Sequence, residues 1–359
     1  MTSDEFFQAQ KYHRDGDFAA AVSLLKGILD RAPKHVAAWR LYAAALRAVG
    51  RRDDAAEADK KGNAIEADHT ADVGASLLFH GDLKRGRVLF ERALALDPDC
   101  VSAHWLLGDI EGREGADDRA LAHYRRCLEI DPERTGPAYM IAAMGEGDVP
   151  AQAPTDYVID FFDWYAEEFD AHLTNNLNYN GPQQVAGTLR TLRPDGVGRT
   201  IDLGCGTGMA GAAAQGLVGP LTGIDLSSEM LRMAEARGIY ESLIEDELLS
   251  AMRAQPDASA DAILAADVFV YMGELAPLFG ECRRVLAPGG IFIATFEDAL
   301  AATETWKLEH SGRYIHALAY LERIAADAGF IDVVSSPIVL REEYGEPVQS
   351  LLVSFERAA

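Results

Sequence analysis

A glycine recurs at nearly constant spacing through the first third of this chain of 359 residues. The repeated glycines are Gly16, Gly50, Gly81 and Gly115, and the steps between them are 34, 31 and 34 residues. Prolines share another position of the same period, at Pro33, Pro98 and Pro132. This period is typical of stacked two-helix units that bury their apolar faces only against each other. We therefore expect a helical array, with a glycine in the turn of each unit and a proline closing its second helix.

Small residues mark a further position of the period, at Ala9, Ala43, Gly74 and Gly108. They are expected where paired helices approach each other closely. The second unit departs from the pattern, because Ala67 stands where a proline is expected. Its 31-residue step indicates that three residues have been deleted from a connection.

The last unit, "SAHWLLGDIEGREGADDRALAHYRRCLEIDP", carries the pattern best and resembles the tetratricopeptide repeat (TPR). The resemblance implies a concave groove that binds a peptide or a partner protein. The alternative is that the array only braces the second domain or a dimer. We assign residues 3–135 to the repeats and residues 136–155, which include "GEGDVPAQAP", to a linker.

From residue 156 onward, short apolar runs alternate with helical patterns. The expected strands are "RTIDLG", "PLTGIDLS", "DAILAADVF", "GIFIATFE", "GFIDVVSSPIVLR" and "VQSLLVSFERA", and one expected helix is "YIHALAYLERIAADAG". This alternation predicts an α/β domain over residues 156–359, with a mostly parallel sheet covered on both faces. Ligands of such sheets bind outside the carboxyl ends of the strands.

The first strand of this domain runs into "DLGCGTG", residues 202–208. A glycine-rich turn lets the backbone approach a ligand closely and points the amides of the next helix at it. The spacing is not G-x-G-x-x-G and no "GK[ST]" follows, which argues against dinucleotide and P-loop sites. Asp225 ends the next strand, where a carboxylate can accept both hydroxyls of a ribose. The alternatives are a tight connection without a ligand and, for Asp225, a helix N-cap.

The combination of "TIDLGCGTG", Asp225, "ILAADVF" and "RRVLAPGG" resembles the signature of class I S-adenosylmethionine-dependent methyltransferases. With its repeats, the whole chain resembles bacterial TPR-containing methyltransferases of that class. The resemblance implies an α + α/β chain, in which a TPR-like helical array precedes a Rossmann-like domain with a mostly parallel seven-stranded sheet. It also implies S-adenosylmethionine as the cofactor.

The resemblance further implies roles for single residues. Gly204, Gly206 and Gly208 would pass the backbone close to the methionine end of the cofactor, and Asp202 would help to hold its amino group, directly or through water. Asp225 would take the ribose hydroxyls, and either Asp246 or Glu247 the adenine amino group. Asp267 would lie at the floor of the reaction site and orient cofactor or acceptor. Tyr165, with Phe169 and Tyr179, would cover the cofactor, although each aromatic residue also suits an ordinary packing helix.

Methyl transfer to a hydroxyl or a protonated amine needs a base, for which a histidine or a carboxylate is suited. His316 is the leading candidate and Glu297 the second. We expect Arg313, Tyr314 and Arg341 to supply an anion-binding or orienting set for the acceptor. The alternatives are a partly buried helix residue for His316 and surface ion pairs for the two arginines. The histidine spacing does not favour a metal site.

We therefore predict methyl transfer to oxygen or nitrogen of a small acidic or neutral metabolite, or of a protein or peptide presented by the repeats. The alternative is a scaffold that binds S-adenosylmethionine without turnover. The formal net charge of −24 opposes a nucleic-acid substrate, as does the absence of "NPPY" and of a placed cysteine nucleophile. We expect a cytoplasmic protein with no membrane segment, because the chain lacks a signal sequence, a long apolar run and paired cysteines.

Overall fold

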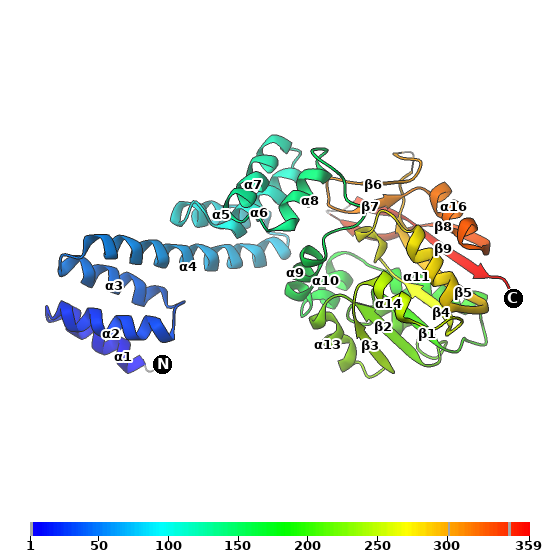
Figure 1. Ribbon diagram of the computed structural model, residues 1–359, viewed down its shortest axis with the longest axis horizontal. Coiled ribbons are helices and arrows are strands. Elements are labelled where there is room, and N and C mark those ends of the chain that lie inside the picture. The colour runs from blue at the N-terminus through cyan, green and yellow to red at the C-terminus, as the bar shows by residue number, and fades with distance from the viewer. Residues whose placement is uncertain (1–2, 301, 344–345) are drawn as a thin grey trace. The chain divides into compact units, whose positions relative to one another are not determined.

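The computed structural model describes residues 3–300, 302–343 and 346–359, and it divides into two compact units between Ala138 and Tyr139 (Figure 1). The first unit is helical, and the second contains a seven-stranded sheet. These are the two kinds of structure that the sequence predicts. The second unit, which carries the predicted site residues, is called the catalytic unit below.

The helical unit consists of antiparallel helices joined by short turns. Its helices are α1 (Ser3–Arg14), α2 (Phe18–Arg31), α3 (Val36–Ala48), α4 (Arg52–Phe79), α5 (Leu83–Leu96), α6 (Val101–Arg113) and α7 (Asp117–Ile130). The repeated glycines lie in the turns before α2, α4, α5 and α7, with φ between +72° and +83°. Glycine adopts this left-handed conformation without steric cost. The predicted place of the glycines in the turns is confirmed.

Helix α4 explains the irregular 31-residue step. It runs for 28 residues without interruption, so it includes both the second helix of one repeat and the first helix of the next. Ala67, at the position where a proline is expected, lies fully buried inside this helix. The sequence predicts a shortened connection, and the structure shows that the two helices are instead continuous.

The small residues at the recurrent position lie where paired helices are in closest contact. Ala9 and Ala43 are fully buried. A Cβ atom added to Gly74 would lie 2.6 Å from the Phe90 ring, and one added to Gly108 would lie 2.7 Å from the Tyr124 ring. The predicted close approach is confirmed, and the aromatic residue of the second helix occupies the space that each glycine leaves.

Gly108→Ala is expected to lower the free energy of unfolding of the helical unit by about 1–3 kcal/mol, because the new methyl group overpacks the buried Tyr124 ring. Gly27→Ala is the matched control, since its Cβ would meet only Arg31 Nη1 at 3.8 Å. That substitution should stabilise α2 by up to about 1 kcal/mol. Urea denaturation followed by circular dichroism measures both. Equal stability of the two variants would contradict this account of the packing.

The catalytic unit is built on a twisted sheet of mostly parallel strands. The strands are β1 (Thr200–Leu203), β2 (Leu221–Asp225), β3 (Ser242–Glu245), β4 (Ala260–Ala265), β5 (Leu286–Glu297), β8 (Phe330–Glu343) and β9 (Glu346–Arg357). Their order in the sheet is β3-β2-β1-β4-β5-β9-β8, and β9 runs antiparallel to both β5 and β8. Strand β8 is therefore parallel to β1–β5. The edge at which these parallel strands end is called the carboxyl edge below.

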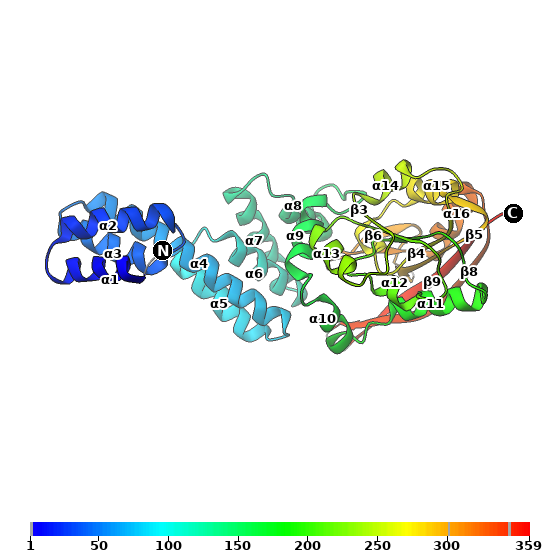
Figure 2. The ribbon, with the colours of Figure 1, turned by 90° about the horizontal axis from the view of Figure 1, so that it is seen from below.

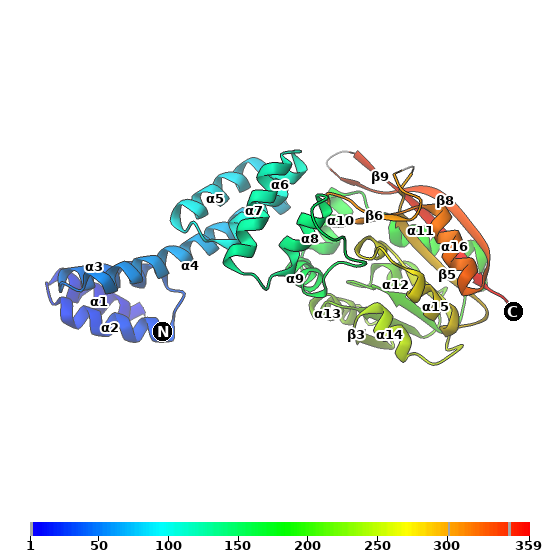
Figure 3. The same ribbon diagram turned by 45° about the horizontal axis from the view of Figure 1, so that its top comes forward.

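Helices cover both faces of the sheet (Figures 2 and 3). One face packs against α14 (Leu248–Ala254), α15 (Ala276–Val285) and α16 (Leu318–Ala328), with Phe279 and Phe292 fully buried between helix and strand. On the other face, Val185 and Leu189 of α11 (Gly181–Leu192) pack against Ile291 and Ile293 of β5. Every strand expected from the apolar runs is present. The central strands β1 and β4 are buried almost throughout, whereas β8, at the edge of the sheet, is largely exposed.

One expected helix begins later than predicted. The pattern "YIHALAYLERIAADAG" opens with β7 (Tyr314–His316), which pairs with β6 (Trp306–Leu308) in a hairpin, and α16 starts only at Leu318. Gly312 lies in the turn of this hairpin with φ +75°. Strand pairing across that turn decides the conformation of residues 314–316.

The segment expected to be a linker contains ordered structure. Helix α8 (Thr135–Ala143) crosses the division between the units. Beyond it, Ala153 N donates to Tyr271 O (2.8 Å), and Gly273 N donates to Ala151 O (2.8 Å). Residues from Tyr139 onward therefore belong to the catalytic unit.

Candidate active site at the carboxyl edge of the sheet

The glycine turn follows β1 and is sterically restricted to glycine at two positions. Gly204, Gly206 and Gly208 have φ of +61°, +53° and +89°. A Cβ on Gly204 would lie 2.2 Å from Val268 Cγ2, and one on Gly208 would lie 2.9 Å from the Tyr240 ring. Near Gly206, by contrast, only Phe169 comes within 4.0 Å. The backbone is thus open to a ligand at Gly206.

Asp202, in β1, is a fully buried carboxyl group. Its Oδ2 accepts hydrogen bonds from Tyr240 Oη (2.7 Å) and Gly211 N (3.1 Å). Its Oδ1 has no hydrogen-bond partner among the residues that the structure describes. Burial raises the pKa of Asp202 to about 7, although both hydrogen bonds act in the opposite direction. A buried carboxylate oxygen without a partner is costly, and a cationic ligand would relieve that cost.

Asp225, at the end of β2, lies beside the glycine turn as predicted. Its Oδ2 accepts from Gly206 N (2.8 Å) and its Oδ1 from Ser227 N (2.9 Å). Burial raises the pKa of this carboxyl group. The N-cap of α13 (Ser228–Ala236) is Ser227, not Asp225, because the Ser227 hydroxyl accepts from Met230 N (3.0 Å). Asp225 therefore keeps acceptor capacity on both oxygens.

The two acids proposed for the adenine amino group both hydrogen-bond at the start of α14. Glu247 is the N-cap and accepts from Ser250 N (2.9 Å). Asp246 accepts from Glu247 N (2.8 Å) and from the Ser250 hydroxyl (2.9 Å). Asp246 is also bonded to the end of β2, where its N donates to Asp225 O (3.1 Å). The adenine role of either acid stays a prediction.

A covering segment, residues 155–180, crosses the carboxyl edge and contains α9 (Thr155–Tyr165) and α10 (Phe169–Asn176). Asp163 accepts from the Ser227 hydroxyl (2.6 Å), and Asp170 accepts from the Thr207 hydroxyl. At its far end, Asn180 N donates to Leu340 O of β8 (3.1 Å). The segment thus bonds to the glycine turn, to the loop after β2 and to the outer strand.

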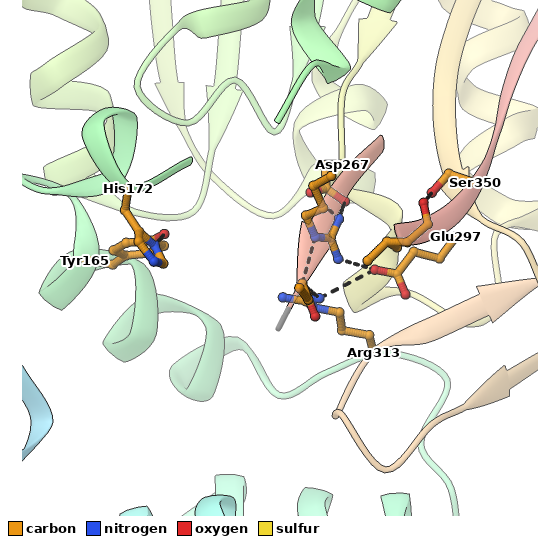
Figure 4. Close-up of polar contacts among 9 residues, drawn as sticks. Tyr165, His172, Asp267, Glu297, Arg313 and Ser350 are labelled. Atoms are coloured by element: carbon orange, nitrogen blue, oxygen red, sulfur yellow. Dashed lines mark hydrogen bonds and ion pairs between the residues drawn. The ribbon is translucent and has the colours of Figure 1, made fainter. Parts of the chain in front are cut away.

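Tyr165, predicted to cover the cofactor, is buried at the end of α9. Its hydroxyl is hydrogen-bonded to His172 Nδ1 (Figure 4). Its ring packs edge-on against Phe169, with the ring centroids 4.9 Å apart. Burial raises the pKa of Tyr165, and Arg313 and Arg341 are among its electrostatic neighbours. The hydroxyl therefore stays protonated at neutral pH.

Five charged side chains meet beyond the glycine turn and form what we call the acid–arginine cluster (Figure 4). Its members are Asp267 after β4, Glu297 at the end of β5, Arg313 of the hairpin, and Arg341 and Glu343 of β8. Arg341, only 2% exposed, lies at its centre. The cluster lies beside the glycine turn, because Val268, the neighbour of Asp267, packs against Gly204, where an added Cβ would lie 2.2 Å from Val268 Cγ2.

Arg341 binds all three carboxylates of the cluster. Its Nη1 donates to both oxygens of Asp267 (2.8 and 2.7 Å), and its Nε donates to Glu343 Oε1 (2.7 Å). Its Nη2 donates to Glu297 Oε1. Asp267 has a left-handed backbone, with φ +61°, and its N donates to Thr295 Oγ1 (2.8 Å). This backbone conformation and the two-point ion pair fix the carboxylate of Asp267.

The two glutamates of the cluster have pKa values shifted in opposite directions. Burial raises the pKa of Glu297, although Arg313 and Arg341 lower it in part. Burial also acts on Glu343, but there the two arginines dominate and lower the pKa to about 2. Neighbouring groups with separated pKa values are suited to different tasks. Glu297 is suited to exchange a proton, and Glu343 to remain ionised.

His316 and Tyr314 lie outside the acid–arginine cluster. His316 is fully buried, and its Nε2 donates to Met272 O (2.9 Å). The Tyr314 hydroxyl donates to Pro150 O (2.7 Å). The structure thus brings Glu297, Arg313, Arg341 and Asp267 together and places the leading candidate base elsewhere.

His316 is expected to make the catalytic unit sensitive to acid. Burial lowers its pKa to about 4, below the roughly 6.5 of an unfolded chain. Since the unfolded state binds the proton first, the stabilisation present above pH 6.5 is lost as pH falls toward 4. Between pH 7 and 5 the loss is about 2 kcal/mol. Urea denaturation of the wild type and His316→Phe measures it, because the variant lacks this contribution. The same pH dependence in both proteins would contradict the assignment.

Glu343, Asp163 and Asp170 were not singled out from the sequence. Strand periodicity places Arg341 and Glu343 on one face of β8, so a search for alternate charged residues at a strand end would have found that pair. No comparable signal marks the two aspartates of the covering segment. Their partners, Ser227 and Thr207, lie far away in the sequence.

Comparison with known proteins agrees with this geometry. Residues 201–294 match a family model described as a methyltransferase domain, and residues 12–75 and 74–135 match two models of the tetratricopeptide repeat. A ubiquinone biosynthesis O-methyltransferase of Xylella fastidiosa is 27% identical over 148 residues, which cover 38% of this chain and 60% of that protein. One of Xanthomonas oryzae pv. oryzae is 27% identical over 135 residues, or 34% of this chain and 56% of the relative. The chain thus spans little more than half the length of these relatives.

Solved methyltransferase structures share low sequence identity with the chain. One from Thermotoga maritima, described as a possible histamine N-methyltransferase, is 19% identical with a TM-score of 0.42 and covers 55% of this chain and 99% of that chain. The 1,6-didemethyltoxoflavin-N1-methyltransferase of Burkholderia thailandensis, solved with S-adenosylhomocysteine, is 16% identical with a TM-score of 0.47. It matches 59% of this chain and 94% of that chain.

The family matches and the strand order define the class. The chain carries a methyltransferase domain over residues 201–294 and tetratricopeptide repeats over residues 12–135, and it is similar to S-adenosylmethionine-dependent methyltransferases. S-adenosylmethionine is the cofactor of this class. Within the described residues, no helix is long and apolar enough to cross a membrane.

Proposed function

We propose that this protein transfers a methyl group from S-adenosylmethionine to a hydroxyl or amine nitrogen of a small molecule, with Glu297 accepting the proton. The observation that carries the proposal is the position of Glu297 in the acid–arginine cluster, 9% exposed and with a raised pKa. A base whose pKa lies nearer to neutral accepts a proton more effectively than an ordinary carboxylate. The names of the curated relatives, which are O-methyltransferases, favour oxygen as the acceptor atom.

The cofactor side of the edge fits S-adenosylmethionine. Asp202 Oδ1, buried and without a partner among the described residues, would take the amino group. Asp225, whose two oxygens already hold Gly206 N and Ser227 N in place, would take the ribose hydroxyls. The backbone at Gly206 would lie against the bound cofactor. Once bound there, the cofactor supplies the activated methyl group.

The protein's own contribution to the reaction is alignment and proton transfer. Arg341 fixes Asp267 and Glu297 through direct ion pairs, so both carboxylates are held before the acceptor arrives. Glu297 takes the proton of the acceptor O–H or N–H as the new bond to carbon forms. Glu343 remains ionised and balances the charge of the arginines while Glu297 gains its proton.

The proposal is tested with full-length protein, S-adenosylmethionine labelled in its methyl group, and an acceptor panel. Phenolic compounds suit the panel, because a phenolic hydroxyl loses its proton to a carboxylate base more readily than an aliphatic hydroxyl does. Catechol, dopamine, 3,4-dihydroxybenzamide and 3,4-dihydroxybenzoate vary the charge on one ring. Label in an organic product, with one S-adenosylhomocysteine per methyl group, is expected. Tight S-adenosylhomocysteine binding without transfer to this panel, to simple amines or to peptides would favour the non-catalytic scaffold.

Affinity for S-adenosylhomocysteine is expected to rise with pH up to about 7. Binding of its ammonium group requires ionised Asp202, whose pKa in the free protein is about 7. Below that pH a proton must leave, and affinity falls about tenfold per pH unit. Calorimetric titration between pH 5.5 and 8 measures the slope. Asp202→Asn should bind more weakly and lose the slope, and an unchanged slope in this variant would contradict the role of Asp202.

We further propose that the tetratricopeptide repeats bind a peptide segment, either of a substrate or of a partner protein. The repeat matches and the regular helix pairs support this proposal. Gly108→Ala, which disturbs the last repeat, distinguishes repeats that bind a substrate peptide from repeats that bind a separate partner protein. Loss of peptide methylation with small-molecule turnover retained would indicate that the repeats present the substrate. Retention of both activities would favour a separate partner.

A further inference from the structure

The acid–arginine cluster contains more negative than positive groups. Asp267, Glu297 and Glu343 face Arg313 and Arg341, so the cluster carries a surplus of one negative charge when all its members are ionised. Protonation of Glu297 would bring it only to neutrality. These contacts oppose the expectation from the sequence that the two arginines bind an anion.

Both arginines are already paired with carboxylates of the cluster. All three nitrogens of Arg341 donate to cluster carboxylates, and the side chain is 2% exposed. Arg313 is less buried, but its Nη1 lies against Glu343 and 3.6 Å from Glu297 Oε1. An acceptor carboxylate that approached Arg313 would meet two carboxylates as well. In a site of low dielectric, that repulsion opposes the attraction of one partly neutralised guanidinium.

The surroundings of the cluster have the same sign. Residues 139–359 contain 33 acidic and 13 basic side chains. Residues 155–176 of the covering segment contain six acidic residues and no lysine or arginine. Clefts lined by one sign of charge concentrate ligands of the opposite sign and repel ligands of the same sign. Both the approach to the site and its interior therefore favour cationic ligands over anionic ones.

We infer that the methyl acceptor is a neutral or cationic molecule, and that the potential at the point of transfer is negative enough to reject acceptors bearing a carboxylate or phosphate. This inference rests on the proposed function, because it describes the acceptor of the same site. It replaces the expectation of a small acidic metabolite. The arginines hold the cluster carboxylates in place, and the carboxylates, with Glu297 among them, face the acceptor.

The relative affinities of two cofactor analogues report the electrostatic potential at the point of methyl transfer, and the acceptor need not be known. Sinefungin carries an ammonium group where the methyl group is transferred, whereas S-adenosylhomocysteine is neutral there. Calorimetric titration of both into full-length protein at pH 7.5 should show sinefungin binding at least tenfold more tightly. Glu343→Gln, which removes one cluster charge, should reduce that ratio severalfold. Glu322→Gln, which removes a charge from an exposed position of α16, should leave it unchanged.

The outcomes separate this inference from the proposed function. If S-adenosylhomocysteine does not bind, the proposed function fails. If it binds at least as tightly as sinefungin, or if Glu343→Gln leaves the ratio unchanged, only the charge inference is overturned. The acceptor panel gives an independent result: methylation of 3,4-dihydroxybenzamide at least ten times faster than 3,4-dihydroxybenzoate supports the inference. Preference for the benzoate overturns it.

Discussion

Glu297→Gln is expected to reduce the rate of methyl transfer by about 10²- to 10⁴-fold, the usual contribution of a general base. Glutamine has the same shape and its side-chain oxygen still accepts from Arg341, but it takes up no proton. The loss should appear in kcat, because the amide leaves the cofactor side of the edge intact. Turnover of the best acceptor of the panel, with labelled S-adenosylmethionine, measures it.

The pH profile distinguishes loss of a base from loss of structure. In the wild type, kcat should rise with pH through the raised pKa of Glu297, since the base must be ionised to act. The variant should lack that rise and still bind S-adenosylhomocysteine with wild-type affinity. Glu304→Gln, at an exposed position a few residues further on, is the matched control. Full activity of Glu297→Gln would assign the proton to another group.

Asp225→Ala is expected to weaken S-adenosylhomocysteine binding by about 30- to 1,000-fold, or roughly 2–4 kcal/mol. The substitution removes two acceptors for the ribose hydroxyls and also leaves Gly206 N and Ser227 N without their partner. Both effects act on the cofactor side alone. Calorimetric titration into folded protein, checked by circular dichroism, gives the value.

Two further variants, Asp225→Asn and Glu235→Gln, serve as controls for the loss of S-adenosylhomocysteine affinity in Asp225→Ala. The asparagine keeps one side-chain oxygen and should bind with intermediate affinity. Glu235 lies exposed near the end of α13, so its substitution removes a charge of the same sign without touching the glycine turn. Wild-type affinity of Asp225→Ala would place the ribose elsewhere.

The cofactor half of the site could be predicted because its information is local. Asp202 to Gly208 lie in one strand and one turn, and Asp225 ends the next strand. Because β1 and β2 are adjacent strands of the parallel sheet, these two ends are neighbours. The hydrogen bond from Gly206 N to Asp225 Oδ2 (2.8 Å) confirms that they meet. The repeat glycines were predictable for a similar reason, since each fixes a turn within its own unit.

The acceptor half could be predicted only in part, because it depends on long-range strand order. Asp267, Glu297 and Arg341 meet because β9 inserts between β5 and β8 and brings the end of β8 to the carboxyl edge. Glu343 lies among several acids in "REEYGE", and only its alternation with Arg341 along the strand distinguishes it from them. For His316 the helical pattern was misleading, since a hairpin turn at Gly312 precedes it and directs its ring into the core.

The most direct test of this account is a crystal structure of the full chain with S-adenosylhomocysteine. The account predicts the amino group of the ligand within hydrogen-bond distance of Asp202 Oδ1, the ribose hydroxyls on Asp225, and the sulfur directed toward the acid–arginine cluster. A ligand bound away from the glycine turn, or one whose sulfur points away from Glu297, would contradict it.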